Sequence, residues 1–399
     1  MNDCLDANRA LWNTWTQLHA DMPNQPLSAL AYPQNRRARV RPSLSTDLRL
    51  LHSLLEIPSL SGQEADATAF LAGWMAEHGM QAFVDAAGNA VGILDGGTGV
   101  DGQTAQDIVL LGHIDTVGGD VPVRIEDGKL YGRGAVDAKG PLAAFAAAAA
   151  QVGPQPGWRI IVVGAVEEEA ATSKGARFAT IQYRPALCVI GEPSGWNRVT
   201  LGYKGRLLAH VTVQQAMAHS AGPDASVCEV AVTLWNRVLG RMAEINSGKE
   251  RVWDQVQPSL RSFYSESDGL QETARMTLGF RLPLDLGPEA IQAELLALAG
   301  AVELHFEGAE VAFRSDKNNP LVRAFLAAIR GQGEQPGFVL KTGTADMNVV
   351  GPVWQCPIVA YGPGDSTLDH TPNENVIIEE WQRSVEVLVA MLRRVVQGL

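Results

Sequence analysis

The 399-residue sequence lacks any run of about 18 consecutive apolar residues, the length that a membrane-spanning helix needs. Its beginning also lacks the basic start and the continuous apolar segment of a secretory signal. We therefore expect a soluble, cytoplasmic protein without a membrane partner.

Cysteines and basic residues are also scarce. The four cysteines are scattered and form no C-x-x-C pair, which argues against a disulfide framework and against a structural zinc knot. The 32 lysines and arginines are outnumbered by 44 aspartates and glutamates, so the net charge is −12. Nonspecific nucleic-acid binding calls for a basic face, and we expect no nucleic-acid partner.

Apolar residues are abundant, at 46% of the chain, and the length suits two domains. Residues 1–45 show no clear helix or strand period, and we interpret them as an N-terminal appendage. From residue 46 onward we expect a first domain over residues 46–204 and 315–399. A second domain, over residues 205–314, is inserted into it.

Four short apolar runs have the composition of strands buried on both faces. They are DIVLLGHID, WRIIVVGAVEEE, ALCVIGEP and PIVAYGPG, and the alanine-rich LAAFAAAAAQ is typical of a crossover helix. This alternation predicts an α/β fold with a doubly wound, mostly parallel sheet, whose ligands gather outside the carboxyl ends of the strands. Residues 205–314 instead follow the order β-α-β-β-α-β, which predicts a ferredoxin-like α+β domain.

The strand ends carry candidate metal ligands. In LLGHIDTV, His113 and Asp115 lie two residues apart on an extended backbone and point to the same side. Asp137 lies in a glycine-rich loop before a helix, where a carboxylate could reach two cations or could merely cap the helix. Three adjacent glutamates (167–169) follow the second run, and Glu192 follows the third.

A late loop, GPGDSTLDHTPNE, adds His370 to this set. Clustered carboxylates repel one another and need a compensating charge, which divalent metal supplies. Two imidazoles with several carboxylates suit zinc, with cobalt or manganese also feasible. We therefore predict two divalent metal ions, zinc or alternatively cobalt, at a hydrolytic site.

These ordered motifs resemble the acetylornithine deacetylase and succinyl-diaminopimelate desuccinylase family of di-zinc amidohydrolases and peptidases, over about residues 47 to 395. The resemblance implies that His113 binds one metal, that Asp115 orients it, and that Asp137 bridges both ions. It implies terminal ligand roles for Glu192 and His370.

The family's glutamate pair, base first and metal ligand second, fits V-E-E-E in two registers. We prefer Glu168 as the base and Glu169 as the ligand, because Gly164 then lies four residues before the base. The other register, with Glu167 as base and Glu168 as ligand, stays open.

The resemblance also implies a homodimer, in which the inserted domain sends a histidine into the partner's active site. His219 of MAHSAG matches that position, although the usual downstream G-x-N is replaced. Arg281 resembles a family arginine that can anchor a substrate carboxylate, or could be an ordinary exposed strand arginine. Lys341 and Gly343, in KTGT, lie in a loop that could present an ammonium and backbone N–H groups to a carboxylate, or could be a plain turn.

Finer details resemble one branch of the family, which hydrolyses lysine or ornithine from an amino-group carrier protein. The motifs are GRGAVDAKGP, IGEPSGWNRVTLGYKGR, KTGTADMNVV and GPGDSTLDHTPNE. The expected substrate is a small acidic carrier that ends in glutamate, at the last step of α-aminoadipate-type lysine biosynthesis. Basic residues expected at the mouth of the site are Lys174, Arg177, Lys204 and Arg206.

Two alternatives remain at this point. The first is a deacylase of small substrates, acting on N-acetyl-ornithine, N-acetyl-lysine or succinyl-diaminopimelate. The second is a metal-free binding relative that kept the fold, although no ligand of the set is missing.

Overall fold

The computed structural model describes residues 45–99, 102–219 and 222–398. Everything below concerns the unit Ser43–Leu399. The appendage that we expect over residues 1–45 lies, except for its last residue, outside the described residues.

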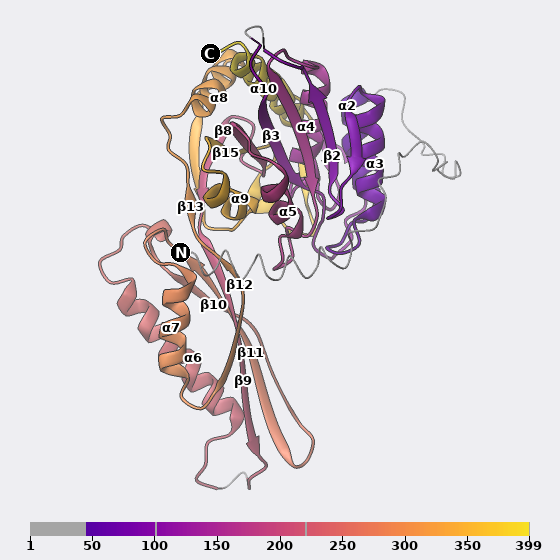
Figure 1. Ribbon diagram of the computed structural model, residues 1–399. Coiled ribbons are helices and arrows are strands. Elements are labelled where there is room, and N and C mark those ends of the chain that lie inside the picture. The colour runs from indigo at the N-terminus through magenta and orange to yellow at the C-terminus, as the bar shows by residue number, and fades with distance from the viewer. Residues whose placement is uncertain (1–44, 100–101, 220–221, 399) are drawn as a thin grey trace. The chain divides into compact units, whose positions relative to one another are not determined.

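In the part of the chain that the structure describes, nine strands form the main sheet in the order β1-β2-β6-β3-β7-β15-β8-β13, with β14 also paired to β8 (Figure 1). The strands, in sheet order, are β1 (Gln81–Val84), β2 (Ala90–Asp95), β6 (Trp158–Ala165), β3 (Gln106–His113), β7 (Leu187–Gly191), β15 (Ile358–Tyr361), β8 (Arg198–Tyr203), β13 (Phe313–Arg314) and β14 (Gly337–Lys341).

The sheet is mixed, which corrects the expectation of a mostly parallel one. The four central strands β6, β3, β7 and β15 are parallel, as the four apolar runs predicted. The flanking pairs β1–β2, β2–β6, β15–β8 and β8–β13 are antiparallel. The connections from β1 to β2 and from β7 to β8 hold no crossover helix and are shorter than the dozen or so residues that a parallel crossover needs.

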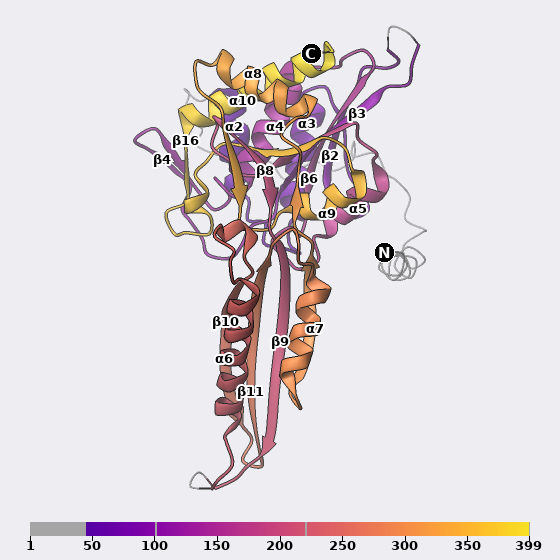
Figure 2. The ribbon, with the colours of Figure 1, turned by 90° about the vertical axis from the view of Figure 1, so that its left-hand side faces the viewer.

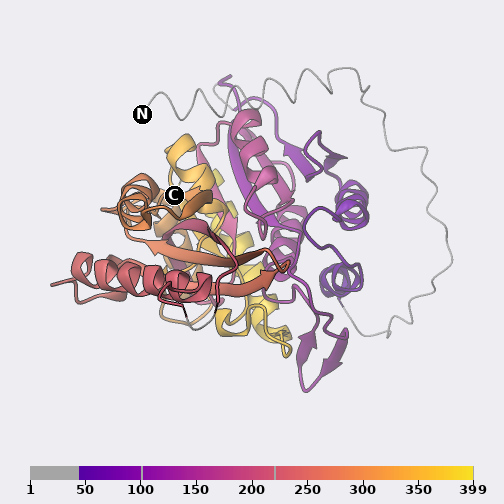
Figure 3. The ribbon, with the colours of Figure 1, turned by 90° about the horizontal axis from the view of Figure 1, so that it is seen from below.

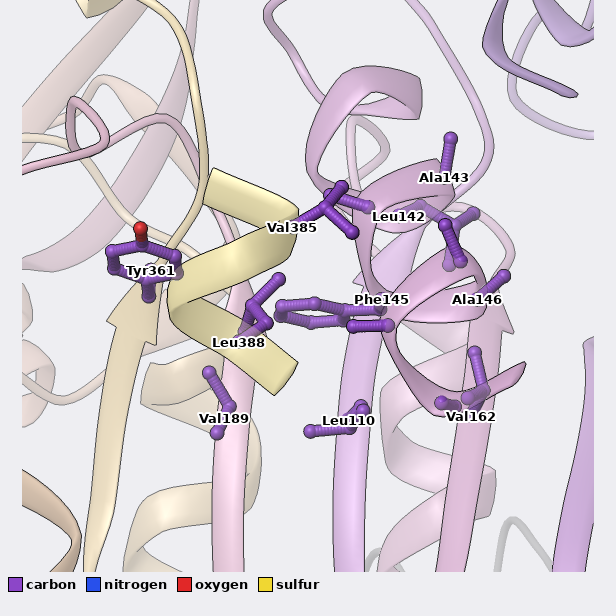
Figure 4. Close-up of a cluster of buried hydrophobic side chains, with 14 of the residues drawn as sticks. Leu110, Leu142, Ala143, Phe145, Ala146, Val162, Val189, Tyr361, Val385 and Leu388 are labelled. Carbon is purple, nitrogen blue, oxygen red and sulfur yellow. The ribbon is translucent and has the colours of Figure 1, made fainter. Parts of the chain in front are cut away.

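Helices cover both faces of this sheet (Figure 3). One face packs against α2 (Thr46–Leu55), α3 (Ala65–Glu77), α4 (Lys139–Val152), α8 (Pro320–Gly331) and α10 (Ile378–Val396), and the other against α5 (Lys174–Gln182) and α9 (Asp346–Trp354). Figure 4 shows Phe145 of α4 and Leu388 of α10 over Leu110 and Val189 of the central strands. No helix among the described residues is long and apolar enough to cross a membrane.

A second sheet, of four strands among the described residues, has the order β10-β11-β9-β12. Its elements follow one another as β9 (Gly205–Ala216), α6 (Val227–Ile245), β10 (Gln257–Ser267), β11 (Gln271–Leu282), α7 (Pro288–Ala299) and β12 (Glu303–Glu310). Both helices pack on one face of this sheet (Figure 2). A small third sheet joins β4 (Arg124–Glu126), β5 (Lys129–Tyr131) and β16 (Asn375–Ile377).

The parallel register of the central strands brings their carboxyl ends to one level. His113 of β3 lies opposite Ala165 of β6, and Gly191 of β7 lies opposite Gly112 and Tyr361. The polar segments that follow these strands therefore meet along one edge of the sheet, where ligands of open α/β sheets gather.

Candidate active site

His113 is the last residue of β3, and only 1% of its surface is exposed. Its Nδ1 atom lies 3.0 Å from the backbone oxygen of Asp115, which can only accept a hydrogen bond. In the neutral ring the proton therefore sits on Nδ1, which leaves Nε2 as a ligand atom. Burial alone would lower the pKa of His113, but hydrogen bonds with Asp115 and Asp137 raise it well above its usual value. A metal ion at Nε2 would take the place of that second proton.

Asp115 is completely buried and ties His113 to the glutamate turn. Its carboxylate accepts hydrogen bonds from the Ser61 hydroxyl at 2.7 Å and from the backbone N–H groups of Glu168 and Glu169 at 3.1 and 3.0 Å. One oxygen also lies 3.5 Å from Nδ1 of His113. Burial raises the pKa of Asp115, but the hydrogen bond and charge of His113 more than offset it and lower the pKa.

Asp137 lies between two imidazoles. One carboxylate oxygen is 3.1 Å from Nε2 of His113, and the other is 3.0 Å from Nε2 of His370. Burial opposes ionisation of Asp137, but both histidines hold its pKa well below the usual value. One carboxylate whose two oxygens each face a different imidazole nitrogen could bridge two metal ions.

The three consecutive glutamates after β6 point to different partners. Glu169 places an oxygen 2.8 Å from Nε2 of His370, and Glu168 places one 4.0 Å from Nε2 of His113. Glu167, with a φ of +59°, instead accepts a hydrogen bond from a threonine hydroxyl at 2.6 Å. Glu169 thus lies beside His370 and Glu168 beside His113, whereas the hydrogen bond of Glu167 is to a threonine.

Glu192 completes the group around His113, with an oxygen 4.0 Å from its Nε2 atom. Burial, followed by the charge of Asp137, raises the pKa of Glu192 to about 8, and burial raises the pKa of Glu168 well above its usual value. These carboxyls therefore need a nearby cation if they are to be ionised at neutral pH. Among the described residues, ligand atoms of His113, Asp137 and Glu169 lie within 4.8 Å of one another. This set of nitrogen and oxygen donors fits divalent metal.

Arg281 brings the inserted domain to the cluster. Its guanidinium donates a hydrogen bond to the Thr344 hydroxyl. Burial, and then the charges of Arg206 and Arg261, lower the pKa of Arg281 to about 10, while the charge of Glu168 opposes this shift. The side chain thus contacts the segment after β14 and lies near enough to Glu168 for the two charges to interact.

The loop after β14 also faces the cluster. Burial raises the pKa of Glu192 and of Asp369, to about 8 in both cases, and the positive charge of Lys341 opposes that rise. A Cβ atom built on Gly343 would meet no atom within 4 Å, so this loop borders open space. Lys341 and Gly343 therefore lie where a bound carboxylate could reach them.

His219 is not brought to the cluster of its own chain. It follows the far end of β9, which begins at Gly205 beside the main sheet and extends to Ala216 (Figure 2). At about 3.3 Å per residue, the two ends of this strand are roughly 35 Å apart. His219 is exposed there, beyond the reach of its own active site.

The four basic residues expected at the mouth of the site behave differently from one another. Lys204 contradicts the expectation, because it is completely buried and donates to the backbone oxygens of Val252 and Gln255 and to the Gln257 side chain. Nothing in the sequence around Lys204, between β8 and β9, indicates that its side chain is buried. The others have local partners: Lys174 pairs with Glu167 at 3.5 Å, Arg177 pairs with Glu310, and Arg206 donates to the Gly308 oxygen at 3.2 Å.

Several residues around the cluster had escaped the sequence analysis. The Ser61 hydroxyl donates a hydrogen bond to Asp115, and the Glu64 carboxylate accepts one from the Glu167 N–H at 3.1 Å. Asp346 is 2% exposed, and its carboxylate oxygens have no hydrogen-bond partner among the described residues. In the sequence, the only sign of Asp346 was its place in the motif KTGTADMNVV, and Ser61 and Glu64 lie in no motif that we had singled out.

Comparison with known proteins adds to this geometry. A family model described as Peptidase family M20/M25/M40 matches residues 109–394. A LysW-lysine hydrolase of Deinococcus radiodurans is 47% identical over 365 residues, which cover 90% of this chain and 99% of that protein. A putative LysW-lysine/LysW-ornithine hydrolase of Thermococcus kodakarensis is 38% identical, with 86% of this chain and 91% of that protein covered.

Solved structures show the same fold. An M20 family metallo-carboxypeptidase of Sulfolobus solfataricus matches with a TM-score of 0.71 at 18% identity, covering 89% of this chain and 100% of that one. At this identity the likeness concerns the fold alone.

Proposed function

Because the chain belongs to peptidase family M20/M25/M40, we propose that it hydrolyses the amide bond between lysine, or ornithine, and the C-terminal glutamate of a small amino-group carrier protein. The protein is a metal-dependent amide hydrolase. The observation that carries the chemistry is the position of the Asp137 carboxylate between the imidazoles of His113 and His370. The substrate follows from the names of relatives that align over most of this chain. The reaction would release free lysine at the end of α-aminoadipate-type biosynthesis.

Two divalent metal ions fit the donor set, zinc in our proposal, with cobalt as the alternative. His113, Asp137 and Glu192 would hold one ion, and Asp137, Glu169 and His370 the other. When bound, the ions supply Lewis acidity that polarises the scissile carbonyl and acidifies water.

Glu168 is the proposed general base. Its carboxylate lies 4.0 Å from Nε2 of His113, and none of the contacts described above joins it to another side chain. It takes a proton from the attacking water and then delivers it to the α-amino nitrogen of the departing lysine, so the same carboxylate serves both proton transfers. Asp115 accepts hydrogen bonds from the backbone N–H of Glu168 and from the ring of His113. It thereby fixes the position of the proposed base, Glu168, relative to the proposed ligand, His113.

We assign substrate binding to Arg281 and to the segment that holds Lys341 and Gly343. Arg281 binds the α-carboxylate of the lysine, and the loop with Lys341 and Gly343 adds an ammonium and backbone N–H groups. A guanidinium already bound to the Thr344 hydroxyl is held in place before the substrate arrives, which lowers the entropy lost on binding.

The partner subunit is needed to complete the site. We propose a homodimer in which His219 stabilises the oxyanion at the partner's site, since this residue cannot reach its own. Exposed apolar side chains along one edge of the inserted domain support such an interface. They are Val232 and Leu239 on α6, and Leu260 and Phe263 on the edge strand β10.

A cluster of arginines supports an acidic carrier as substrate. Arg206 and Arg281 are direct neighbours on β9 and β11, and a Cβ on Gly279 would lie 2.8 Å from the Arg261 side chain. The three guanidiniums thus gather at the end of the inserted sheet nearest the catalytic cluster. In a protein of net charge −12, this local positive charge would attract an acidic partner.

The test is to incubate the metal-loaded protein with carrier-linked lysine, carrier-linked ornithine and the corresponding N-acetyl amino acids. We expect free amino acid to be released fastest from a carrier-linked substrate. Faster release from N-acetyl-lysine or N-acetyl-ornithine would identify a small-substrate deacylase instead. No release from any substrate would contradict the proposed activity.

A further inference from the structure

Glu374 makes an unusual set of contacts for a residue outside the proposed ligand set. It is completely buried. One carboxylate oxygen accepts hydrogen bonds from the backbone N–H groups of Gly134, Val136 and Asp137, at 3.0, 3.0 and 3.1 Å. The other oxygen accepts one from Arg133 at 2.7 Å. A single side chain thus satisfies four donors of one five-residue segment.

This segment depends on Glu374 for its shape. Buried N–H groups need acceptors, and three N–H groups that converge on one point cannot be satisfied by a helix or a sheet. The convergence bends the backbone so that the Asp137 side chain projects between the two imidazoles. Without the Glu374 carboxylate, three N–H groups would be buried and unsatisfied, and the segment would rearrange to reach other acceptors.

Glu374 also belongs to the second loop of the site. It lies four residues after His370, and Arg133 donates a further hydrogen bond to the backbone oxygen of Thr371 in the same loop, at 3.3 Å. Glu374 therefore ties the loop that carries Asp137 to the loop that carries His370.

The two metal positions of the proposed function depend on these loops to different extents. Around one ion, His113 and Glu192 come from or directly follow β3 and β7, which are central strands of the sheet. Around the other ion, both Asp137 and His370 come from the loops that Glu374 joins. The second position therefore has two of its three ligands under the control of this one side chain.

We infer that Glu374 is a positioning residue that determines whether the metal position formed by Asp137, Glu169 and His370 is filled. The inference rests on the proposed two-metal site. It goes further by assigning unequal stability to the two positions, and by tracing the difference to a carboxylate that binds neither ion.

The experiment compares metal stoichiometry in the wild-type chain and in Glu374→Ala and Glu374→Gln variants. Each protein is stripped with a chelator, titrated with Co²⁺ by calorimetry, and followed by its visible absorption. We expect two ions per wild-type chain. For Glu374→Ala we expect one ion at near-wild-type affinity and a second weakened by about a hundredfold, because supporting contacts typically alter metal affinity by 10 to 100-fold.

Glu374→Gln separates the two kinds of contact. A glutamine oxygen still accepts the three N–H groups, while its amide faces Arg133 with a donor in place of an acceptor. We expect the second ion to bind with an affinity between those of the wild-type and Glu374→Ala proteins. If the alanine variant fails to fold, the glutamine variant still carries the test.

The matched control is Asp107→Asn. Asp107 is also a buried carboxylate that accepts two hydrogen bonds from an arginine, Arg159, but it lies at the opposite end of β3 from His113. This variant should lose stability and keep both ions. Two ions at wild-type affinity in Glu374→Ala, or equal loss of both ions, would overturn the inference. Absence of metal binding by the wild-type chain would instead overturn the proposed function.

Discussion

Nε2 of His370 lies 2.8 Å from a carboxylate oxygen of Glu169, while the preceding glutamate, Glu168, lies beside His113 instead. Glu168 and Glu169 are adjacent in sequence, but each lies beside a different histidine. Glu168→Gln should retain metal and lose turnover by about 10³-fold, the usual contribution of a general base. Glu169→Gln should weaken metal binding by at least about tenfold.

The measurement is metal content after dialysis, together with kcat. Glu167→Gln is the matched control and should keep both properties, because Glu167 points toward Thr172 and Lys174. Near-normal turnover by Glu168→Gln, with loss of turnover in Glu167→Gln, would establish the alternative register.

The proposed role of His219 predicts complementation between inactive variants. His219→Ala and Glu168→Gln should each be inactive as homodimers. In a mixed dimer, one site would combine a normal Glu168 with the partner's His219. After subunit exchange, an equal mixture should recover up to about a quarter of wild-type activity, because half of the dimers are mixed and each has one intact site.

Sedimentation analysis of the same mixture would report the oligomeric state. A monomer, or a mixture that stays inactive although the subunits exchange, would rule out a role for His219 across the interface.

The sequence predicts much of the sheet and part of the site, because both depend on recognising the central strands. The four central strands are continuous apolar runs, and parallel strands place their ends together, so the proximity of His113 and Glu192 follows from the strand assignment. The antiparallel flanks were missed because an apolar run does not reveal the direction of its neighbour. The lengths of the connections between strands indicate the direction, because a parallel pair needs a longer connection than an antiparallel pair.

Side-chain direction within loops could not be predicted. Three identical glutamates offer no chemical distinction, and nothing in the sequence signals the left-handed backbone of Glu167. The burial of Lys204 depends on backbone oxygens about fifty positions later in the chain, and the contacts of Glu374 span about 240 positions. Such contacts between a side chain and a distant backbone leave no local pattern.

The arginine cluster predicts how carrier and small substrates will differ. Arg261→Glu should raise KM for carrier-linked lysine by about tenfold at low salt, with kcat little changed, because a charge at the rim of an interface acts mainly on association. The effect should shrink as ionic strength rises, since screening weakens exposed charges. The KM for N-acetyl-lysine should stay unchanged in Arg261→Glu.

The control for this experiment is Arg323→Glu, which reverses an exposed charge on α8, away from the cluster. It should leave both KM values unchanged. An equal rise in KM for the carrier-linked and the acetylated substrate would show that Arg261 acts on the site itself and not on the carrier.

Asp346 predicts an unusual dependence of stability on pH. Burial raises the pKa of this carboxyl from 3.8 to about 7, and its oxygens have no hydrogen-bond partner among the described residues. A group whose pKa is raised by folding stabilises the fold while protonated in both states, and this contribution is lost as the pH rises through about 7. Asparagine resembles the protonated form in shape and cannot ionise.

In the metal-free protein, Asp346→Asn should therefore gain free energy of unfolding relative to wild type as the pH rises. The difference should grow by about 3 kcal/mol between pH 5 and pH 8, because the unfolded chain is already ionised at pH 5 while the folded protein ionises this carboxyl only near pH 7. Urea unfolding in the presence of chelator at both pH values measures it. Asp107→Asn serves again as control and should destabilise at both pH values, because it removes a paired carboxylate. A difference for Asp346→Asn that does not change with pH would mean that this carboxyl is paired in solution, and that its burial imposes no penalty on ionisation.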